Sequence, residues 1–387
     1  MSSVSDLLAE LDDIGRDARG GWSRPGFGPI ADALREWFAA QAEAAGLDVV
    51  PDANGNLWAW WDGPGDDAVV TGSHLDSVPG GGRFDGPLGV ASALVAVRRL
   101  RAGGFVPVRP IAVVVFAEEE GSQLGIACFG SRLLTGAIDP ASVIPDGFTG
   151  LDRAAAGRDE AALGRIGRFV ELHIEQGRGL VDLDAPIGLA TGILAHGRWR
   201  MTVTGRGDHA GSTRMHDRTD PVVAAARVVL AVEGAALAAE GARATVGRLQ
   251  AVPGGTNVIA SHVELSLDVR AADGTAVREV IGRIEEAGAL ESARNGCAFG
   301  LEQTSWSDEV VFDEALRAEL DAVLGGVPSL PTGAGHDAGV LAAHVPTAML
   351  FVRNPTGVSH APDEHATDAD LDAGVTALER VLRHLAA

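Results

Sequence analysis

The sequence predicts an α/β protein with a mixed, largely parallel sheet and an inserted α+β unit. The apolar run at 110–117, which is rich in β-branched residues, is typical of a strand buried on both faces of a sheet, and another strand is expected at 168–174. Between residues 192 and 304 the expected order changes to β-α-β-β-α-β, which is that of a ferredoxin-like unit. We therefore expect one domain formed by residues 1–191 and 305–387 and a second formed by residues 192–304.

Each expected element has its own local signal. In the first domain we expect two helices within 4–46 joined by a loop at 20–28, a hairpin over 47–61 turning at Asn54-Gly55, a strand at 68–70, a helix over 90–101, strands at 110–117 and 168–174, and a helix from about Gly130. The inserted domain should have strands at 199–204, 244–251, 262–271 and 298–303, with helices beginning at Pro221 and spanning 275–287. Residues 146–167 are interpreted as a linker, and a helix at 311–325 and a core strand at 346–353 complete the first domain.

The bulk composition excludes several classes of function. A formal net charge of −22 argues against nucleic acid as a partner, because phosphates need a basic surface. All 31 basic residues are arginine, which excludes lysine Schiff-base chemistry and a Walker lysine. Two cysteines, Cys128 and Cys297, cannot form a disulfide framework and are interpreted as buried thiols. With no signal-peptide pattern and no apolar run of ~20 residues, we expect a cytoplasmic protein that does not enter a membrane.

Metal-ligating side chains follow several of the predicted strands. His74 and Asp85 flank a glycine-rich loop after the strand at 68–70, Glu120 follows the next strand, and His173 ends the third. His360 follows the strand at 346–353. Parallel strands end at one edge of the sheet, and two divalent ions need a bridging carboxylate with nitrogen and carboxylate ligands on either side. The sequence therefore predicts a two-metal hydrolytic centre with these five ligands.

The acidic residue Asp76 and the acidic run Glu118–Glu120 each allow two interpretations. Asp76 is either a turn-capping aspartate or the acceptor of the other imidazole N–H of His74. The run Glu118–Glu120 is either a solvated turn or a cluster whose mutual repulsion raises pKa values, which is what a general base requires.

The chain resembles a known family in seven motifs that span almost its whole length. They are GSHLDSVPGGGRFDGPLG, EEEGS, ELHIEQG, DHAGSTRM, NVIASHVELSLDVR, TGAGHDAG and GVSHAP. These motifs are similar to those of the carbamoylase and allantoate amidohydrolase branch of the di-zinc exopeptidase-like enzymes. The resemblance implies a di-metal catalytic domain and an inserted lid and dimerisation domain.

The resemblance also implies roles for individual residues. His74 and His173 would bind one metal, Glu120 and His360 the other, and Asp85 would bridge. Glu119 would be the general base, with Asp76 beside it. His209 would polarise the substrate carbonyl in a partner subunit, so that the enzyme is a homodimer. The substrate would contact a further set of residues: Gln176, Asn257, Arg270 and His336.

The same resemblance predicts the reaction, which is hydrolysis of the ureido C–N bond of a small anionic substrate with release of carbon dioxide and ammonia. The runs at 196–200 and 351–360 are most similar to sequences assigned to allantoate. Allantoate is therefore the first substrate, and N-carbamoyl-L-amino acids or β-ureidopropionate are the alternative. Dipeptides or acylamino acids are less favoured, because peptidase relatives usually carry an acidic ligand where His173 stands. Zinc and manganese suit the ligand set, as would cobalt or nickel.

Some positions depart from the family pattern or carry a further expectation. Gln123-Leu124 stands where the family usually has arginine and phenylalanine, and Arg214 replaces a usual proline. The family tends to have a cis peptide after the bridging aspartate, so we expect one at Asp85–Gly86. A nucleotide-binding role for the glycines near 333–339 is disfavoured, because their spacing does not fit the dinucleotide fingerprint.

Overall fold

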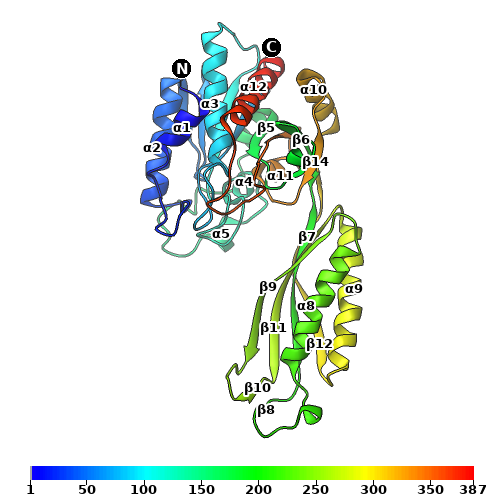
Figure 1. Ribbon diagram of the computed structural model, residues 1–387. Helices are drawn as coiled ribbons and strands as arrows, with labels where there is room; N and C mark the ends of the chain where they lie inside the picture. The colour runs from blue at the N-terminus through cyan, green and yellow to red at the C-terminus, as the bar shows by residue number, and fades with distance from the viewer. Residues whose placement is uncertain (1) are drawn as a thin grey trace. The chain divides into compact units, whose positions relative to one another are not determined.

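The computed structural model describes residues 2–387, which form two compact units (Figure 1). The first unit comprises the chain up to Ile193 together with Val311–Ala387, and the second comprises Leu194–Val310. Each unit has its own hydrophobic core and is described by itself.

A mixed sheet forms the centre of the first unit. Its strands are β1 (Leu47–Pro51), β2 (Leu57–Trp61), β3 (Ala68–His74), β4 (Ile111–Phe116), β5 (Ile166–Ile174), β6 (Ile187–Ile193), β13 (Val310–Val311), β14 (Ser329–Thr332) and β15 (Thr347–Val352). The order is β1-β2-β4-β3-β5-β15-β6-β13, with β14 beside β6. The central strands β4, β3, β5 and β15 are parallel, whereas β1 and β2 pair antiparallel. The predicted α/β class with a largely parallel sheet is confirmed.

The parallel strands bring their carboxyl ends to one edge of the sheet. Strands β3, β4 and β15 are buried along their whole length, as expected of strands covered on both faces. His74 is the last residue of β3, and His173 lies at the end of β5. Glu118 follows β4 after a single intervening residue. The polar side chains therefore gather where the backbone leaves the sheet.

Helices pack on both faces of this sheet. The main hydrophobic core lies under α1 (Val4–Glu10), α2 (Pro29–Ala44), α3 (Pro87–Ala102), α10 (Glu314–Leu324) and α12 (Asp368–Leu385). A smaller core around Phe27 and Phe129 involves α4 (Phe129–Thr135). The short helices are α5 (Pro140–Val143), α6 (Glu160–Arg165), α7 (Gly179–Asp182) and α11 (Asp337–Leu341). In Figure 1, α3 and α12 lie side by side, and they are in contact.

The turn from Asp85 into α3 corrects one expectation. The peptide bond after Asp85 is trans, and the described part of the chain has its cis bond at Val252–Pro253. Gly86, with φ of 85°, reverses the chain before Pro87 opens the helix. A glycine reaches this conformation without the cost of a non-proline cis bond, which is ~3–4 kcal/mol.

The second unit has the strand order of a ferredoxin-like fold. Its main elements are β7 (Ala195–Thr204), α8 (Pro221–Leu237), β9 (Arg243–Val252), β11 (His262–Ala271), α9 (Gly274–Ala293) and β12 (Ala298–Ser307). The antiparallel sheet runs β12-β7-β11-β9, and alternate residues of β11 are buried beneath α8 and α9. The connections of this unit contain further short elements. β8 (Asp208–His209) and the 3-10 turn η1 (Met215–Asp217) lie between β7 and α8, and β10 (Val258–Ile259) lies between β9 and β11. β8 and β10 pair to form a small second sheet.

Several elements had no prediction from the sequence. The expected linker at 146–167 ends in α6, and β6, α7 and α12 had not been recognised. The helix expected over 311–325 begins only at Glu314, after β13. Both cysteines are free and buried, as predicted. Among the helices of residues 2–387, none combines the length and apolarity that crossing a bilayer requires.

Candidate metal centre

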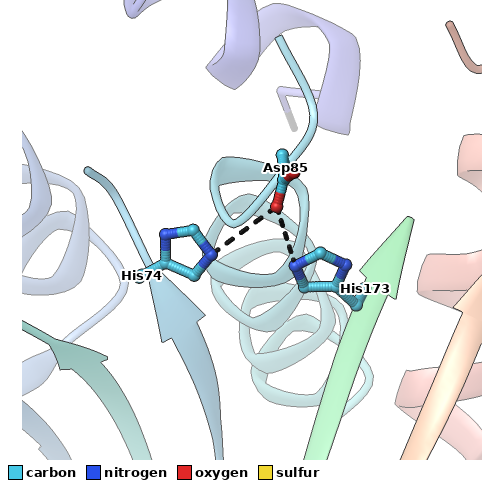
Figure 2. A group of neighbouring side chains, drawn as sticks. All are labelled: His74, Asp85 and His173. Carbon is cyan, nitrogen blue, oxygen red and sulfur yellow. Dashed lines mark ion pairs between the residues drawn. The ribbon is translucent and has the colours of Figure 1, made fainter. Parts of the chain in front are cut away.

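Asp85 lies between two buried histidines (Figure 2). Its Oδ1 is 3.7 Å from Nε2 of His74 and 3.2 Å from Nε2 of His173. His74 comes from the end of β3 and His173 from the end of β5, and these strands are paired in the sheet. The three side chains form a group whose nitrogen and oxygen atoms are close enough to hold one ion.

The second oxygen of Asp85 belongs to another group. Nε2 of His360 is 3.4 Å from Asp85 Oδ2 and 3.4 Å from Glu120 Oε2. Ligand atoms of these three residues also lie close enough together to hold one ion. Asp85 is therefore shared by two neighbouring groups through its two oxygens, which is the arrangement that a bridging carboxylate requires.

Unsatisfied polar atoms test whether metal ions fit these groups. Nε2 of His74, Nε2 of His173 and Oε1 of Glu120 are buried and have no hydrogen-bond partner within residues 2–387. Buried polar atoms are rarely left unpaired, so these three atoms are suited to bind metal ions. Imidazole nitrogens and carboxylate oxygens suit zinc or manganese, so the residues fit the expected ions.

The histidine rings are oriented for this role. Nδ1 of His74 is 3.0 Å from the Asp76 carbonyl oxygen, and Nδ1 of His173 is 2.8 Å from the Ile174 carbonyl oxygen. A carbonyl oxygen only accepts, so Nδ1 donates in each ring, and in the neutral ring the lone pair lies on Nε2, facing Asp85. Such partners fix the tautomer of a metal-ligating histidine.

Asp76 does more than either of its two predicted roles. Its backbone carbonyl is the closer partner of His74, while its carboxylate Oδ1 lies 3.5 Å from the same nitrogen. The two carboxylate oxygens accept the backbone N–H groups of Glu119 and Glu120, at 3.1 and 3.0 Å. Asp76 thus ties the end of β3 to the turn that follows β4.

The three consecutive glutamates have three different environments. Glu118 accepts N–H groups from Gly26, Gln123 and Leu124 and so organises the surrounding loops. Glu120 contacts His360, as described above. Burial, with Asp85 nearby, raises the pKa of Glu120 to about 8 in the metal-free chain.

Glu119 lies close to the histidine group without belonging to it. Its Oε2 is 3.8 Å from Nε2 of His74, and its Oε1 accepts a hydrogen bond from the Cys128 thiol at 3.2 Å. Burial raises the pKa of Glu119 well above its usual value. A carboxylate of this kind beside a candidate metal site can accept a proton from water.

Gln176 and His336 also border the two groups. Gln176 donates to Asp85 Oδ2 at 2.9 Å and to Ser359 Oγ at 3.1 Å. The His336 ring lies 4.5 Å from the His173 ring, and its buried Nε2 has no hydrogen-bond partner in the described chain. Burial, with His173 nearby, holds the pKa of His336 well below its usual value, so this ring is neutral.

Comparison with known proteins assigns the chain to a family. The sequence profile of peptidase family M20/M25/M40 matches residues 70–384. The chain belongs to this family. It is 35% identical to an N-carbamoyl-L-amino acid amidohydrolase of Geobacillus stearothermophilus, over 98% of this chain and 97% of the relative. It is 31% identical to the allantoate amidohydrolase of Escherichia coli K12, over 99% and 98% of the two chains.

Solved structures agree with this assignment. A hydantoinase/carbamoylase family amidase from Burkholderia multivorans superimposes with a TM-score of 0.88 at 32% identity, covering 99% of this chain and 97% of that one. The resemblance to the carbamoylase and allantoate amidohydrolase branch is confirmed. This M20-family chain is a hydrolase that acts on carbon–nitrogen bonds other than peptide bonds.

The remaining predicted site residues of this M20-family chain lie in its second unit. His209 and Asn257 are exposed neighbours, because β8 pairs with β10 and Ala210 N–H donates to the Asn257 carbonyl at 3.0 Å. Nδ1 of His209 accepts N–H groups from Gly211 and Ser212. In a neutral ring the proton is therefore on Nε2, where it can be donated to a carbonyl oxygen.

Arg270 lies at the opposite end of β11 from these two residues. It pairs in register with His196, whereas the β10 loop joins the His262 end of the strand. Its guanidinium binds both carboxylate oxygens of Asp268, at 2.8 and 3.2 Å. Arg270 lies on the polar side of β11, as its alternation indicated.

Three buried acidic residues of the first unit have no signal in the sequence that predicts a role for them. Glu171 accepts from Ser73 Oγ and from the Ala338 N–H, and Asp337 accepts from Ser131 Oγ. Glu364 accepts from the backbone beside Asp85. All three bind backbone or hydroxyl groups distant in sequence, for which motif spacing carries no signal.

Two of the residues that depart from the family pattern, Gln123 and Arg214, lie in loops. Gln123 Oε1 accepts the Phe27 N–H at 3.0 Å, so its side chain joins the loop after β4 to the loop before α2. Arg214 precedes the 3-10 turn η1 of the second unit and is exposed.

Proposed function

We propose that this chain hydrolyses the ureido C–N bond of a small anionic substrate, with allantoate as the first candidate. One observation carries the proposal: Asp85 is shared by two ligand groups, and the carboxylate of Glu119 lies 3.8 Å from one of their histidines. The relatives whose names include allantoate or N-carbamoyl amino acids support the ureido group as the target.

His74 and His173 would hold one divalent ion and Glu120 and His360 the other, with Asp85 between them. Ions bound there would lower the pKa of the attacking water and would polarise the carbonyl of the ureido group. Zinc and manganese are the metals that this ligand set suits best.

Glu119 would carry a proton from the attacking water to the leaving nitrogen. It takes a proton from water as the oxygen attacks the ureido carbonyl carbon, and it gives that proton to the nitrogen that leaves when the C–N bond breaks. The products are the amine and carbamate, and carbamate decomposes to ammonia and carbon dioxide. Nε2–H of His209 would donate a hydrogen bond to the oxyanion of the tetrahedral intermediate.

Anchoring of the substrate carboxylate is assigned to Arg270 and Asn257, and Gln176 would contact the substrate beside Asp85. Arg270 can bind a carboxylate bidentately, as it already binds Asp268. A substrate carboxylate at this position would therefore compete with Asp268 for the guanidinium.

The positions of Arg270 and His209 support a homodimer. His209 pairs with β10, which is joined to the His262 end of β11, whereas Arg270 lies near the other end of this strand. At the rise per residue of an antiparallel strand, His262 and Arg270 are about 27 Å apart. A small ureido substrate cannot span this length. If both residues act on one substrate molecule, they come from two copies of the chain.

N-carbamoyl-L-amino acids are the second candidate substrate. The observation in their favour is that two relatives named for this activity, from Geobacillus stearothermophilus and Pseudomonas sp. NS671, are each 35% identical to the chain. Allantoate and N-carbamoyl-L-amino acids both carry a carboxylate near a ureido group, so the same anchors serve either one.

The test is ammonia release by purified protein that has been stripped of metal and reloaded with manganese or with zinc. The substrates are allantoate, ureidoglycolate, several N-carbamoyl-L-amino acids and a dipeptide. We expect ammonia from at least one ureido substrate, none without metal, and no cleavage of the dipeptide. Cleavage of the dipeptide alone, or equal ammonia release with and without metal, would overturn the proposal.

A further inference from the structure

Glu364 is a buried carboxylate that holds the backbone on either side of the Phe84–Asp85 peptide. Its Oε2 accepts the N–H of Phe84 at 2.8 Å and the N–H of Asp85 at 3.1 Å. The residue is 4% exposed. One oxygen atom thus fixes the backbone from which the shared carboxylate projects.

The same residue lies one backbone turn after His360. The N–H of Glu364 donates to the Ala361 carbonyl at 3.1 Å, so a single turn separates the histidine from the glutamate. Glu364 therefore joins the loop after β15 to the loop after β3, which are about 280 residues apart along the chain. Asp85 and His360 come from these two loops, and both belong to the same ligand group.

The glycine-rich loop leaves space for this carboxylate. A Cβ at Gly82 would overlap Oε2 and Cδ of Glu364. Gly82 does not have a positive φ, so its backbone would accept alanine. It is the approach of Glu364, and not the backbone conformation, that requires glycine here.

Stability alone is a poor explanation for a carboxylate at this position. Oε1 of Glu364 has no hydrogen-bond partner among residues 2–387. A half-satisfied buried carboxylate is costly, and a residue that only filled space would be better as an apolar side chain.

We propose that Glu364 is a positioning residue that sets the bridging carboxylate of Asp85 relative to His360, and that Gly82 is small in order to admit it. This inference rests on the metal centre of the proposed function. Without Glu364, the Asp85 loop is free to move relative to the His360 loop, and the ions are held less tightly.

Metal affinity tests the proposal directly. Glu364→Ala should weaken metal binding about 10- to 100-fold, the usual effect of removing a group that orients a ligand. The measurements are metal per chain by elemental analysis and the dissociation constant by competition with a chelator of known affinity. Glu364→Gln keeps a carbonyl oxygen that can accept both N–H groups, so it should bind metal with nearly wild-type affinity.

A matched control separates positioning from general stability. Asp159 also accepts two backbone N–H groups with a single oxygen, those of Ala161 and Ala162, but it caps α6 before the start of β5. Asp159→Ala should lower the unfolding temperature and leave the metal dissociation constant unchanged.

Gly82→Ala is an independent probe, because it displaces Glu364 without removing it. It should weaken metal binding in the wild-type background. In the Glu364→Ala background the same substitution should have a clearly smaller effect, since Oε2 and Cδ are gone and only the overlap with the Cβ of residue 364, at 2.7 Å, remains.

The outcomes distinguish this inference from the proposed function. Full metal affinity in Glu364→Ala, or additive losses from Glu364→Ala and Gly82→Ala, would overturn the positioning role and leave the metal centre intact. A wild-type chain that takes up no divalent metal would overturn both.

Discussion

Glu119 and Glu120 show how two identical neighbouring side chains acquire different chemistry. Asp76 holds both of their backbone N–H groups, and this anchor directs the side chains to different partners. Glu120 contacts His360, and Glu119 contacts His74 and Cys128. The roles proposed for them, ligand for Glu120 and base for Glu119, therefore depend on the turn after β4 and not on the residue type.

Replacement of the two glutamates should separate the two roles. Glu119→Gln should lower kcat at least about 100-fold, because an amide cannot accept the proton of the attacking water, while metal content stays at the wild-type value. Glu120→Gln should instead lower the metal content. The measurements are ammonia release and elemental analysis on the same samples. Activity that survives in Glu119→Gln would assign the base elsewhere.

Cys128 should act through Glu119. Its thiol donates to Oε1, which leaves Oε2 facing His74. Cys128→Ala should lower kcat by about three- to tenfold with KM and metal content unchanged, because one hydrogen bond that orients the carboxylate is lost. Cys128→Ser should restore most of the rate, since a hydroxyl also donates. An alanine variant with wild-type kcat would contradict this role.

Site residues that follow strands could be predicted from the sequence, whereas site residues that bind backbone N–H groups could not. His74, Asp85, Glu120, His173 and His360 were selected because strand ends share an edge of the sheet, and the structure brings them together. Glu364 had no such signal, because its partners are two backbone N–H groups in a distant loop. The expected cis bond at Asp85–Gly86 was wrong, because a glycine with positive φ makes the same turn.

At the scale of elements, the strand with a continuous apolar run and the helices within 4–46 were predictable, whereas the C-terminal helix α12 was not. β4 is buried on both faces, which gives a continuous apolar run that no helix spacing explains. α12 mixes charged and apolar residues and is capped by Thr367, whose side chain accepts from the Asp370 N–H. Its pattern becomes informative only with the partner that it packs against, which is α3.

The contact of α3 with the sheet depends on Gly89. A Cβ at this position would overlap the Leu172 carbonyl oxygen and lie 2.8 Å from Ser73 Cβ, in the strands that carry His173 and His74. Gly89→Ala should therefore lower the free energy of unfolding by about 1–3 kcal/mol and weaken metal binding, because the helix must move away from both strands. Urea denaturation and chelator competition measure the two effects.

Gly164 is the control for that substitution. It lies in α6 of the same unit, and a Cβ there meets nothing within 4 Å. Gly164→Ala should leave metal binding unchanged and stabilise the protein by up to about 1 kcal/mol, as alanine does in a helix. If both alanine variants have the same effect, helix propensity and not close packing decides the outcome at Gly89.

At the scale of the whole molecule, the candidate metal centre gathers buried carboxyl groups in a chain whose formal net charge is already −22. Burial raises the pKa of Glu120, Asp337 and Glu364 to about 8 in each case. Neighbouring carboxylates outweigh burial at His74 and raise its pKa as well. Without metal ions, the folded chain therefore holds protons that the unfolded chain would release.

The sign of the pH dependence follows from these raised values. A group whose pKa is higher in the folded state stabilises the fold at low pH, and this stability is lost as the pH rises through the folded value. Metal-free protein should therefore unfold at progressively lower temperature between about pH 5 and about pH 8. Divalent ions replace those protons, so the rise in unfolding temperature on adding manganese or zinc should grow over the same range.

Thermal unfolding across this pH range, with a chelator or with excess metal, measures both slopes. Asp337→Asn removes one raised carboxylate outside the predicted ligand set and keeps an acceptor for Ser131. The variant should therefore show a shallower slope without metal, because one fewer proton is lost by the folded chain as the pH rises. A metal-free unfolding temperature that rose toward pH 8 would mean that the buried carboxylates are ionised and paired within the chain itself. Divalent ions would then not be needed to balance their charge.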